Sequence, residues 1–545
     1  MKKFLRKACV FGMAAAVAGS SLTGVVGKAE GTAEPTANPT TEQTANPAAE
    51  PTESPTTVGF EDSSKFIIQD GVEYWIYNEG YDHDAYAVIE SYTRAENVID
   101  GVFTLPTEVV YNGKTYPVIG ANGSPYTDNH IREVIVPEEF GKQQVKISEI
   151  QMQKPLGGSN FFVLPNVEKI TIKADHLRLC GVYVDTGDYV TDPYRSGPSG
   201  VGLKSKIKEV SITSREISIG KYAISDLANL ETLSLSQAGK VTLDPYAIVN
   251  CGLLKELSLP KDTQFSEGAV SLCKNLEKIN FAEGAGYTGT NEVISAEGTL
   301  LFVPADVTEY TVPDTVKKVG ALAFSSCNKL QTAGCGAETI GEYAFFGCES
   351  MENLKLSNTK TIGSYAFVNT GLSSITIPKS VTDIGDGILY HNKKLKTIKV
   401  SGTNYKSKNG ALLTASGKTL LAVIPKSGTV NIPKGVVTTR MLPVTAPDKV
   451  KEMNFPSTIK NIYQMGKKMK GLVKIKFTSN KVPKGVEQEV SFYDQIFGYT
   501  GYNQAAIYPS AGGKLVIDVP DKAKKAYKKF IKQEIECSPT KYKLK

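Results

Sequence analysis

The sequence predicts a β-rich solenoid, in which short coils of chain stack on one another. Three observations predict it. A unit of about 22 residues is repeated through the middle of the chain, each unit contains a run of alternating apolar and polar residues, and no unit is large enough to bury its own apolar face. Residues 339–400 show the repeat most clearly: each copy has the order I-G-x-x-A-F, a short polar turn and L-x-x-L-x-L.

The alternating run predicts one strand in every coil, because apolar residues at every second position give a strand one buried face. Copies of it begin at residues 131, 167, 207, 230, 253, 276, 330, 351, 372, 395, 450 and 472. VTEYTVP and GTVNIP are two partial copies. The matching spacing predicts about 14 coils, whose strands pair side by side.

Two segments of another kind separate some of the coils. NEVISAEGTLLFVP and NGALLTASGKTLLAVIP resemble each other, and each predicts a β-hairpin, with turns at Glu297-Gly298 and Ser416-Gly417. Each hairpin is expected to be inserted between two coils at an equivalent place. The insertion explains why Ala269 and Ala323, which occupy the same repeat position, are 54 residues apart.

The N-terminal part is predicted to contain three regions. Residues 1–29 have basic residues before a short apolar run, the pattern of a secretory signal peptide, and indicate a secreted protein. Residues 30–57 are rich in Pro, Thr, Ala and Glu and predict a disordered spacer. Residues 58–129 predict a meander of antiparallel strands that caps the solenoid, with Trp75 packed in the core of this cap.

The solenoid is expected over residues 130–484 and a C-terminal cap over residues 485–545. This cap should end in a strand, Pro520 and a basic helix that covers the final open edge. Residues 514–545 carry ten Lys against four acidic residues. The chain without residues 1–29 has 57 basic and 56 acidic residues, a net charge of +1. Since residues 514–545 contribute +6 of this, residues 30–513 have a net charge near −5. The basic tail could contact an anionic cell-wall polymer or form a solvated face, whereas charge confined to one end argues against nucleic acid.

Seven cysteines follow the signal peptide: Cys180, Cys251, Cys273, Cys327, Cys335, Cys348 and Cys537. Four of them lie four residues after the alanine of a repeat, in YAIVNC, GAVSLC, LAFSSC and YAFFGC. They are predicted to stack as small buried side chains that form hydrogen bonds with loop backbone. The Cys-x-x-Cys spacing of a zinc site is absent from the sequence.

Two irregular stretches are the candidates for ligand binding, because function concentrates in loops on a rigid scaffold. Residues 179–203 form a polar loop, and residues 486–513 are rich in aromatic side chains. The candidate binding residues are tyrosines from both: Tyr183, Tyr189, Tyr194, Tyr493, Tyr499 and Tyr502.

The sequence predicts no enzyme, no metal and no cofactor. The four histidines, His83, His130, His176 and His391, are isolated from one another. Asp185-Thr186-Gly187 matches one aspartic-protease tripeptide without the second copy and the flanking apolar strands. Asp82-His83-Asp84 has too few oxygen ligands at regular offsets for a metal loop. Gly512-Gly513-Lys514 lacks the first glycine and the hydroxyl residue of a phosphate-binding loop.

The full unit, L-x-x-I-x-I-P-x-x-V-x-x-I-G-x-x-A-F-x-x-C, resembles the BspA-like leucine-rich repeats of secreted bacterial surface proteins. It is best seen in LSSITIPKSVTDIG and TIGEYAFFGC, and the ending VPDKAKKAYKK is also similar to that family. The resemblance implies a right-handed solenoid with a parallel sheet on its concave face. It also implies an extracellular or surface-associated protein that binds host proteins, glycans or other cells.

Adhesion or recognition of an extracellular protein or glycan is therefore the leading hypothesis. A carbohydrate-active module or hydrolase centred on the aromatic stretch, and a structural spacer of the cell envelope, are the alternatives. Exposed aromatic rings in line would favour glycan binding, two close carboxylates in a pocket would favour hydrolysis, and a featureless charged face would favour a spacer.

Overall fold

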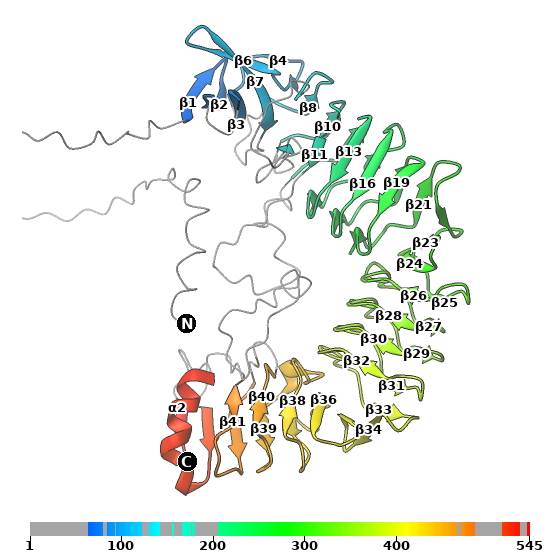
Figure 1. Cartoon of the computed structure of the whole chain (residues 1–545), viewed down its shortest axis with the longest axis vertical. Coiled ribbons are helices and arrows are strands. Elements are labelled where there is room, and N and C mark those ends of the chain that lie inside the picture. The colour runs from blue at the N-terminus through cyan, green and yellow to red at the C-terminus, as the bar shows by residue number, and fades with distance from the viewer. Residues whose placement is uncertain are drawn as a thin grey trace, which may run out of the picture. The chain divides into compact units, whose positions relative to one another are not determined.

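The computed structural model describes residues 64–79, 84–92, 94–121, 130–141, 155–156, 166–175, 177–179, 205–465, 469, 471–485, 515–534 and 542–545. All of the described residues belong to one compact unit, within residues 61–545. Figure 1 shows the strands of this unit following one another in chain order.

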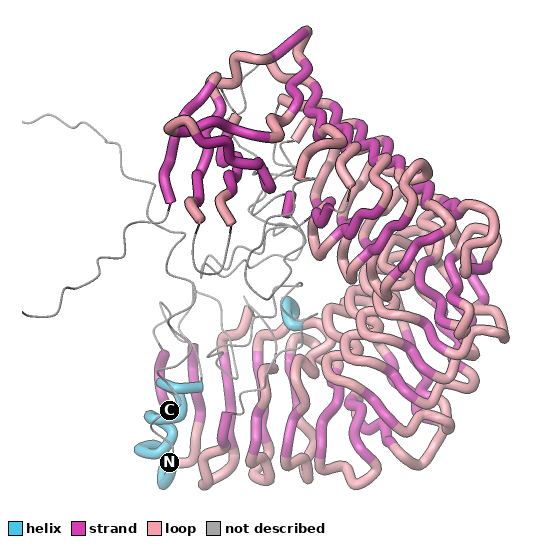
Figure 2. The backbone as a smooth tube through the Cα atoms, turned by 45° about the horizontal axis from the view of Figure 1, so that its top comes forward, coloured by secondary structure: helices cyan, strands magenta, loops and turns pink. Residues whose placement is uncertain are grey.

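Each coil contains a strand that carries the alternating run, which we call the signature strand, and a second strand after it. In one coil these are β12 (Glu209–Ile212) and β13 (Glu216–Ile219), followed by the short strand β14 (Ile224–Ser225). The three strands pair in parallel with β15 (Thr232–Ser234), β16 (Lys240–Leu243) and β17 (Ile248–Val249) of the next coil. The chain is therefore a β-solenoid, as predicted, and its strands repeat from coil to coil in Figure 2.

A strand lies in every segment where the sequence predicted a signature. Besides β12 and β15, the signature strands are β8 (Glu133–Val136), β10 (Lys169–Ile172), β18 (Glu256–Leu259), β21 (Lys278–Phe281), β25 (Glu309–Thr311), β27 (Thr332–Cys335), β29 (Asn353–Leu356), β31 (Ser374–Ile377), β33 (Thr397–Val400), β37 (Thr429–Asn431), β39 (Glu452–Phe455) and β41 (Lys474–Phe477). The registers place apolar residues side by side: Leu233 pairs with Leu257, Leu257 with Ile279, and Ile375 with Ile398. This alignment lets the short segments of neighbouring coils share a buried interior.

The second strands form parallel ladders on another side of the coils. The further members are β11 (Leu177–Leu179), β19 (Asp262–Phe265), β26 (Lys318–Val319), β28 (Thr339–Ile340), β30 (Thr361–Ile362), β32 (Asp383–Ile384), β38 (Thr438–Thr439), β40 (Asn461–Ile462) and β42 (Lys484–Gly485). The short strand β20 (Val270–Ser271) pairs with β17.

The glycine of I-G-x-x-A-F follows a second strand at a place where two coils come very close. A Cβ atom on Gly363 would lie 2.8 Å from the backbone nitrogen of Glu342, and one on Gly385 would lie 2.4 Å from the backbone nitrogen of Ser364. The Gly363 N–H donates to the carbonyl of Ile340 in the preceding coil at 2.8 Å. Glycine recurs there because no side chain fits between the two backbones.

Both predicted hairpins are confirmed. β23 (Val293–Ser295) pairs antiparallel with β24 (Thr299–Phe302), and β35 (Ala411–Thr414) with β36 (Thr419–Val423). Their turns contain Gly298 and Gly417 with φ of 82° and 69°, a conformation that glycine adopts without steric cost. A further short strand joins each hairpin, β22 (Tyr287–Thr288) in the first and β34 (Tyr405–Lys408) in the second.

The hairpins coincide with boundaries in the buried core. One cluster of buried apolar side chains runs from Val72 to Phe302, a second from Ile294 to Ala422 and a third from Ala411 to Ile531. A fourth cluster, from Tyr246 to Leu442, spans both hairpins. The ladder of signature strands is interrupted at both hairpins, between β21 and β25 and between β33 and β37, and also within the central coils, between β29 and β31.

The N-terminal strands differ from the predicted antiparallel meander. β1 (Ser64–Gln69), β2 (Val72–Tyr77) and β3 (Tyr86–Ser91) pair antiparallel, but β3 pairs in parallel with β7 (Lys114–Ala121). The remaining strands are β4 (Val98–Ile99), β5 (Val102–Thr104), β6 (Glu108–Tyr111) and β9 (Pro155–Leu156). β5 pairs with β8 and β7 with β9, so the cap starts both the signature sheet and the second sheet.

The prediction that Trp75 packs in the core of the cap is wrong. β2 buries Val72, Tyr74 and Ile76, and because neighbouring side chains of a strand point to opposite faces, Trp75 lies on the other face. There its ring packs edge to face on Phe66, which is 46% exposed, with centroids 5.4 Å apart.

The stacked thiols are confirmed for the four repeat cysteines, Cys251, Cys273, Cys327 and Cys348, which are all fully buried. The Cys348 thiol donates to the carbonyl of Phe324, and the Cys327 thiol donates to that of Val303. Thr370 and Asn392 continue the same column in the next two coils. The Asn392 amide donates to the carbonyl of Phe367 at 2.7 Å, the same role that the thiols perform.

We expect the thiols of Cys327, Cys335 and Cys348 to resist alkylation while the protein is folded. Burial raises the pKa of all three, that of Cys335 from 9.0 to about 11. At pH 8.5 iodoacetamide should modify these residues only in denaturant, as measured by peptide mass spectrometry. The raised pKa of Cys335 also means that its contribution to stability is complete below pH 9 and falls as the pH rises from about 9 toward 11. Modification of the folded protein at the rate found in denaturant would contradict the expectation.

The C-terminal cap has the predicted strand and basic helix, but the final edge is closed differently. After β43 (Leu515–Asp518) come the 3-10 helix η4 (Asp521–Ala523), α2 (Lys524–Glu534) and β44 (Tyr542–Leu544), and β44 pairs with β43. α2 covers the end of the interior, where Tyr527 and Phe530 pack on Phe477 with ring centroids 5.1 and 5.8 Å apart. The helix therefore closes the core, whereas β44 extends the sheet.

One further 3-10 helix, η3 (Pro447–Lys449), lies between β38 and β39. Among the described residues, no helix has the length and apolar character needed to cross a membrane.

Candidate binding surface

The six tyrosines proposed as binding residues all lie outside the described residues: Tyr183, Tyr189, Tyr194, Tyr493, Tyr499 and Tyr502. So do Asp185-Thr186-Gly187 and Gly512-Gly513-Lys514. The candidate surface is therefore built from the outward side chains of the described strands.

The signature strands of the N-terminal half present a column of short polar side chains, which we call the hydroxyl column. Its half-exposed members come from successive strands that pair in the order β10, β12, β15, β18 and β21: Thr171, Ser211, Ser234, Ser258 and Asn280. They align because each follows a buried apolar residue at the same position of the signature, and those apolar residues are paired in register. Paired strands repeat at about 4.8 Å, so the column offers a regular line of hydrogen-bonding groups without charge.

A column of longer, charged side chains runs beside the hydroxyl column. Lys169 lies between Glu133 and Glu209 of the neighbouring strands, with N–O distances of 3.7 and 3.6 Å. Next to this column, Lys208 donates to Glu168 at 2.9 Å, and this hydrogen bond with the charge of Lys208 lowers the pKa of the Glu168 carboxyl. Such exposed pairs contribute little to stability. They do balance the charge of this face, so it has no strong positive or negative potential. A ligand would therefore be bound mainly by hydrogen-bonding groups.

The I-G-x-x-A-F segments, which we call the arches, carry a second column that the sequence analysis missed. Tyr222, Tyr246, Tyr343 and Tyr365 each precede the repeat alanine and have a positive φ of 53° to 65°. The rings of Tyr343 and Tyr365 stack with centroids 4.8 Å apart.

These rings recur from coil to coil, as a glycan-stacking surface would require, but three of the four are not available for stacking, and Tyr222 is half-exposed. Tyr246, Tyr343 and Tyr365 are each no more than 1% exposed. Their positive φ is unusual for a bulky residue and is supported by backbone hydrogen bonds, such as the one from Tyr365 N–H to the carbonyl of Asp386. The column is therefore part of the packing of the arches.

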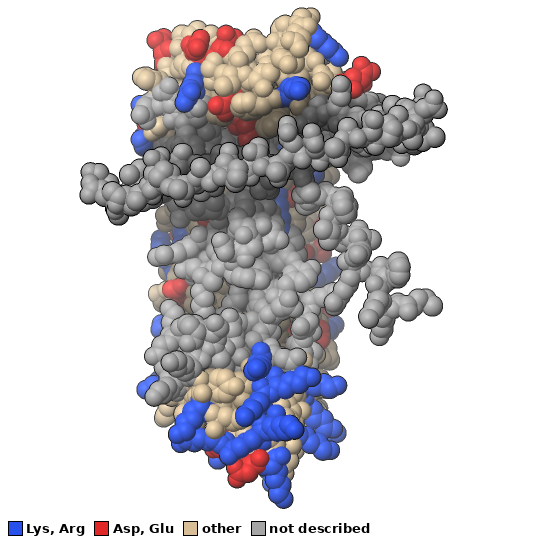
Figure 3. Space-filling view, turned by 90° about the vertical axis from the view of Figure 1, so that its left-hand side faces the viewer, with Lys and Arg blue, Asp and Glu red and all other residues tan. Residues whose placement is uncertain are grey.

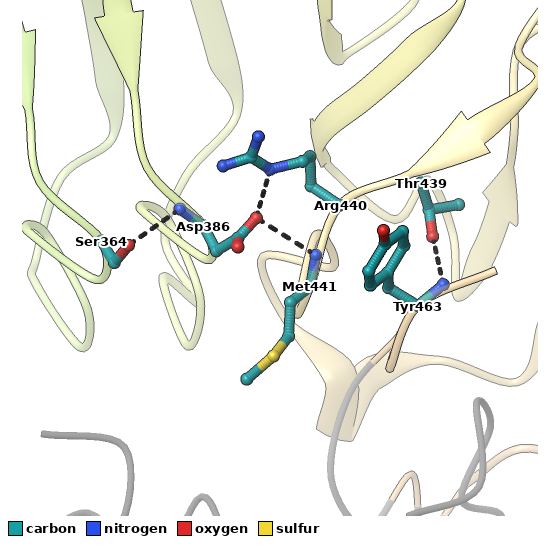
Figure 4. Close-up of polar contacts among 6 residues, drawn as sticks. All are labelled: Ser364, Asp386, Thr439, Arg440, Met441 and Tyr463. Carbon is teal, nitrogen blue, oxygen red and sulfur yellow. Dashed lines mark hydrogen bonds and ion pairs between the residues drawn. The ribbon is translucent and has the colours of Figure 1, made fainter. Parts of the chain in front are cut away.

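A carboxylate joins the coils across each hairpin, and this feature was also missed. Asp386, which is 6% exposed, accepts hydrogen bonds from the Arg440 guanidinium and from the Met441 N–H, at 3.4 Å for the latter. Its own N–H donates to the Ser364 hydroxyl at 3.2 Å. Figure 4 shows Asp386 between Ser364 on one side and Arg440 and Met441 on the other. Beside it, the Tyr463 N–H donates to Thr439.

Glu267 does the same at the first hairpin. Its carboxylate accepts hydrogen bonds from Lys318 and from the Ala321 N–H, which lie 51 and 54 residues further along the chain. Both acids immediately precede a glycine with positive φ, Gly268 and Gly387. In both coils the glycine occupies the position at which other arches have tyrosine. The acid-glycine pair was therefore the sequence signal of a coil that is followed by a hairpin.

The described residues contain one histidine in an ionic cluster. His391 lies 3.6 Å from Asp448, which also pairs with Lys393 at 2.7 Å. Burial acts to raise the pKa of Asp448, but the hydrogen bond from Lys393 and the charges of His391 and Lys393 outweigh it and lower that pKa. The described part of the chain contains no group of three His, Cys, Asp or Glu residues able to hold a metal ion. The cluster joins His391 and Lys393 of one coil to Asp448, which lies after the second hairpin.

Comparison with known proteins gives a match for the repeats. The sequence model of the BspA type leucine rich repeat region matches residues 203–292 and 297–412 in six copies. The gap between the two ranges lies in the first hairpin, at β23 and its turn. No curated protein sequence matches this chain.

Three solved structures illustrate the structural similarity. A leucine-rich repeat protein from Eubacterium ventriosum has 17% identity over 75% of this chain and 89% of that chain, with a TM-score of 0.38. The pneumococcal vaccine antigen PcpA has 14% identity over 88% of this chain and 98% of that chain, also with a TM-score of 0.38. A leucine rich cell surface protein from Faecalibacterium prausnitzii has 15% identity over 74% and 91%, with a TM-score of 0.32.

Proposed function

Because residues 203–292 and 297–412 of this chain are BspA-type leucine-rich repeats, we propose that the protein is a non-enzymatic recognition protein outside the cell or on its surface. Its partner would be an extracellular protein or glycan, bound through many shallow contacts. The proposed contact surface is the hydroxyl column of the signature sheet.

The observation that carries this proposal is the alignment of Ser211, Ser234 and Ser258 in adjacent strands. A rigid sheet holds these hydroxyl groups at a fixed spacing, so a ligand with a repeating backbone or a flat polar surface can form several hydrogen bonds at once. The neighbouring ion pairs keep the face near neutrality, which favours a partner recognised by hydrogen bonds. The signal-peptide pattern in residues 1–29 agrees with an extracellular site of action.

An array of matrix proteins and glycans tests the proposal. The chain from residue 58 to 545 is applied to the array, and each hit is then measured with the double variant Ser211→Arg and Ser234→Arg. Two long charged side chains on a flat contact surface should weaken binding about tenfold or more, because they hold the partner away from the sheet.

The same two coils offer a matched control. Ser218 and Thr242 are paired in register on β13 and β16 and are half-exposed like the serines of the hydroxyl column. The double variant Ser218→Arg and Thr242→Arg should leave affinity within about twofold of the parent. Equal losses in the two variants would refute the assignment of the surface, and an array without any reproducible binding would refute recognition itself.

A further inference from the structure

The C-terminal cap carries a concentration of positive charge that differs from the rest of the array. We call six exposed residues the cap lysines. They lie on α2, on β44 and directly after β44: Lys525, Lys528, Lys529, Lys532, Lys543 and Lys545. Lys545 is held beside the start of the helix, because its N–H donates to the carbonyl of Ile517 and its carbonyl accepts from Val519. Figure 3 shows lysine and arginine side chains gathered at the end of the unit that bears α2 in Figure 1.

Several lysines along the array have an acidic partner one coil away. Lys240 pairs with Glu216, Lys360 with Glu338, and Lys474 with Glu452. In the described part of the cap, the acidic side chains Asp518 and Asp521 pair with Lys476 and Lys524, neither of which is a cap lysine. The cap lysines therefore form no ion pair with Asp518 or Asp521.

Several cap lysines are also neighbours on one helix. Lys525 and Lys529, like Lys528 and Lys532, are separated by four residues, so each pair lies on the same side of α2 about 6 Å apart along the axis. Like charges at this spacing destabilise a helix unless an anion lies between them. The apolar side of α2 is fully used: Tyr527, Phe530 and Ile531 are at most 4% exposed.

We propose that the cap lysines form a binding surface for a linear phosphodiester polymer without bases, the chemical class of polyol-phosphate polymers of cell walls. Phosphates along such a chain can follow the rows of ammonium groups on α2 and continue to Lys543 and Lys545. A membrane fits less well, because a basic helix that binds lipid inserts an apolar side that α2 has already buried. Nucleic acid fits less well because no described aromatic side chain of α2 is exposed for stacking on a base.

Titration of the purified full chain with poly(glycerol phosphate) tests this surface. The cap variant combines Lys525→Gln, Lys528→Gln, Lys529→Gln and Lys532→Gln, since glutamine has a similar helix propensity and no charge. At about 50 mM salt its affinity should fall about tenfold or more. The affinity of the cap variant should also depend less on salt. The slope of log affinity against log salt concentration should become shallower by about 3, the value expected when four phosphates of a single-stranded polyanion are no longer neutralised.

The control makes the same change in net charge on the array. Lys355, Lys394, Lys396 and Lys399 are exposed lysines without an acidic partner among the described residues. Replacing these four with glutamine should change affinity less than about twofold. A second variant, Lys543→Gln with Lys545→Gln, tests the surface without changing α2, and it should weaken binding about threefold or more.

Three results would overturn the proposal. The first is an absence of binding to poly(glycerol phosphate), and the second is an equal loss in the cap variant and its control. The third is tighter binding either to an oligo(dT) with the same number of phosphates or to phosphatidylglycerol vesicles. Circular dichroism and thermal unfolding of every variant show whether the fold is retained, and if the cap variant is unfolded, the β44 variant decides the outcome.

Discussion

Replacing Gly363 with alanine is expected to destabilise the central coils by about 3 kcal/mol or more. The added Cβ would lie 2.8 Å from the backbone nitrogen of Glu342 and from the carbonyl carbon of Gly341. Both are main-chain atoms of the preceding coil, so a change of side-chain rotamer cannot relieve the contact. The coils would have to separate, and the hydrogen bond from Gly363 N–H to Ile340 would lengthen.

Urea unfolding, together with hydrogen exchange of residues 318–384, measures this effect. Gly252→Ala is the matched control, because a Cβ at Gly252 would have no atom within 4 Å and its φ is not positive. That variant should change the free energy of unfolding by less than about 0.5 kcal/mol or stabilise the protein slightly. Equal stability of the two variants would mean that the repeat glycine is not required for close packing of the coils.

Replacing Asn392 with leucine should cost about 3 kcal/mol, although the two side chains are similar in size. Asn392 is fully buried, donates to the carbonyl of Phe367 and accepts from the N–H of Thr370 at 3.1 Å. Leucine removes these interactions, together with the hydrogen bond from the Thr370 hydroxyl, and leaves the Phe367 carbonyl and the Thr370 N–H buried without these partners. The free energy of unfolding in urea is the measurement.

Asn392→Cys is the informative comparison for this column. A thiol occupies the same position in the coil of Cys348 and donates to the carbonyl of Phe324 at 3.3 Å. Cysteine at position 392 should therefore donate a hydrogen bond to the Phe367 carbonyl but accept only a weak one from the Thr370 N–H. The free energy of unfolding should fall by about 1 kcal/mol. If leucine and cysteine cost the same, the column would be stabilised by apolar burial alone.

The repeating part of the fold could be predicted because the same residue pattern recurs in many successive repeats. Alternation in the signature strands determines both the buried face and the register, and a slip of one residue would expose every apolar side chain. The two hairpins were predictable from glycines that tolerate positive φ between apolar runs. The cysteine position was predictable because four repeats share it, but Thr370 and Asn392 share the role without sharing the chemistry of a thiol.

The features that were missed depend on contacts between residues far apart in the chain. Asp386 is ordinary in sequence, and its importance arises because the second hairpin brings Arg440 close to it. Trp75 was expected in the core of the cap, whereas its position between the buried Tyr74 and Ile76 puts it on the outer face. The hydroxyl column was not singled out because serine and threonine on the outer side of a strand carry no distinctive signal until the register aligns them.

The acid-glycine pairs at the hairpins have a consequence for how such a protein can change in length. Glu267 and Asp386 each give the chain beyond a hairpin a fixed point of attachment, made by one carboxylate, one cation and one backbone N–H. A block that begins with a hairpin and ends with an acid-glycine coil could be duplicated or removed as a whole, with its neighbours rejoined by the same chemistry. The number of coils could then change in evolution by whole blocks, without any change to the residues of the interior.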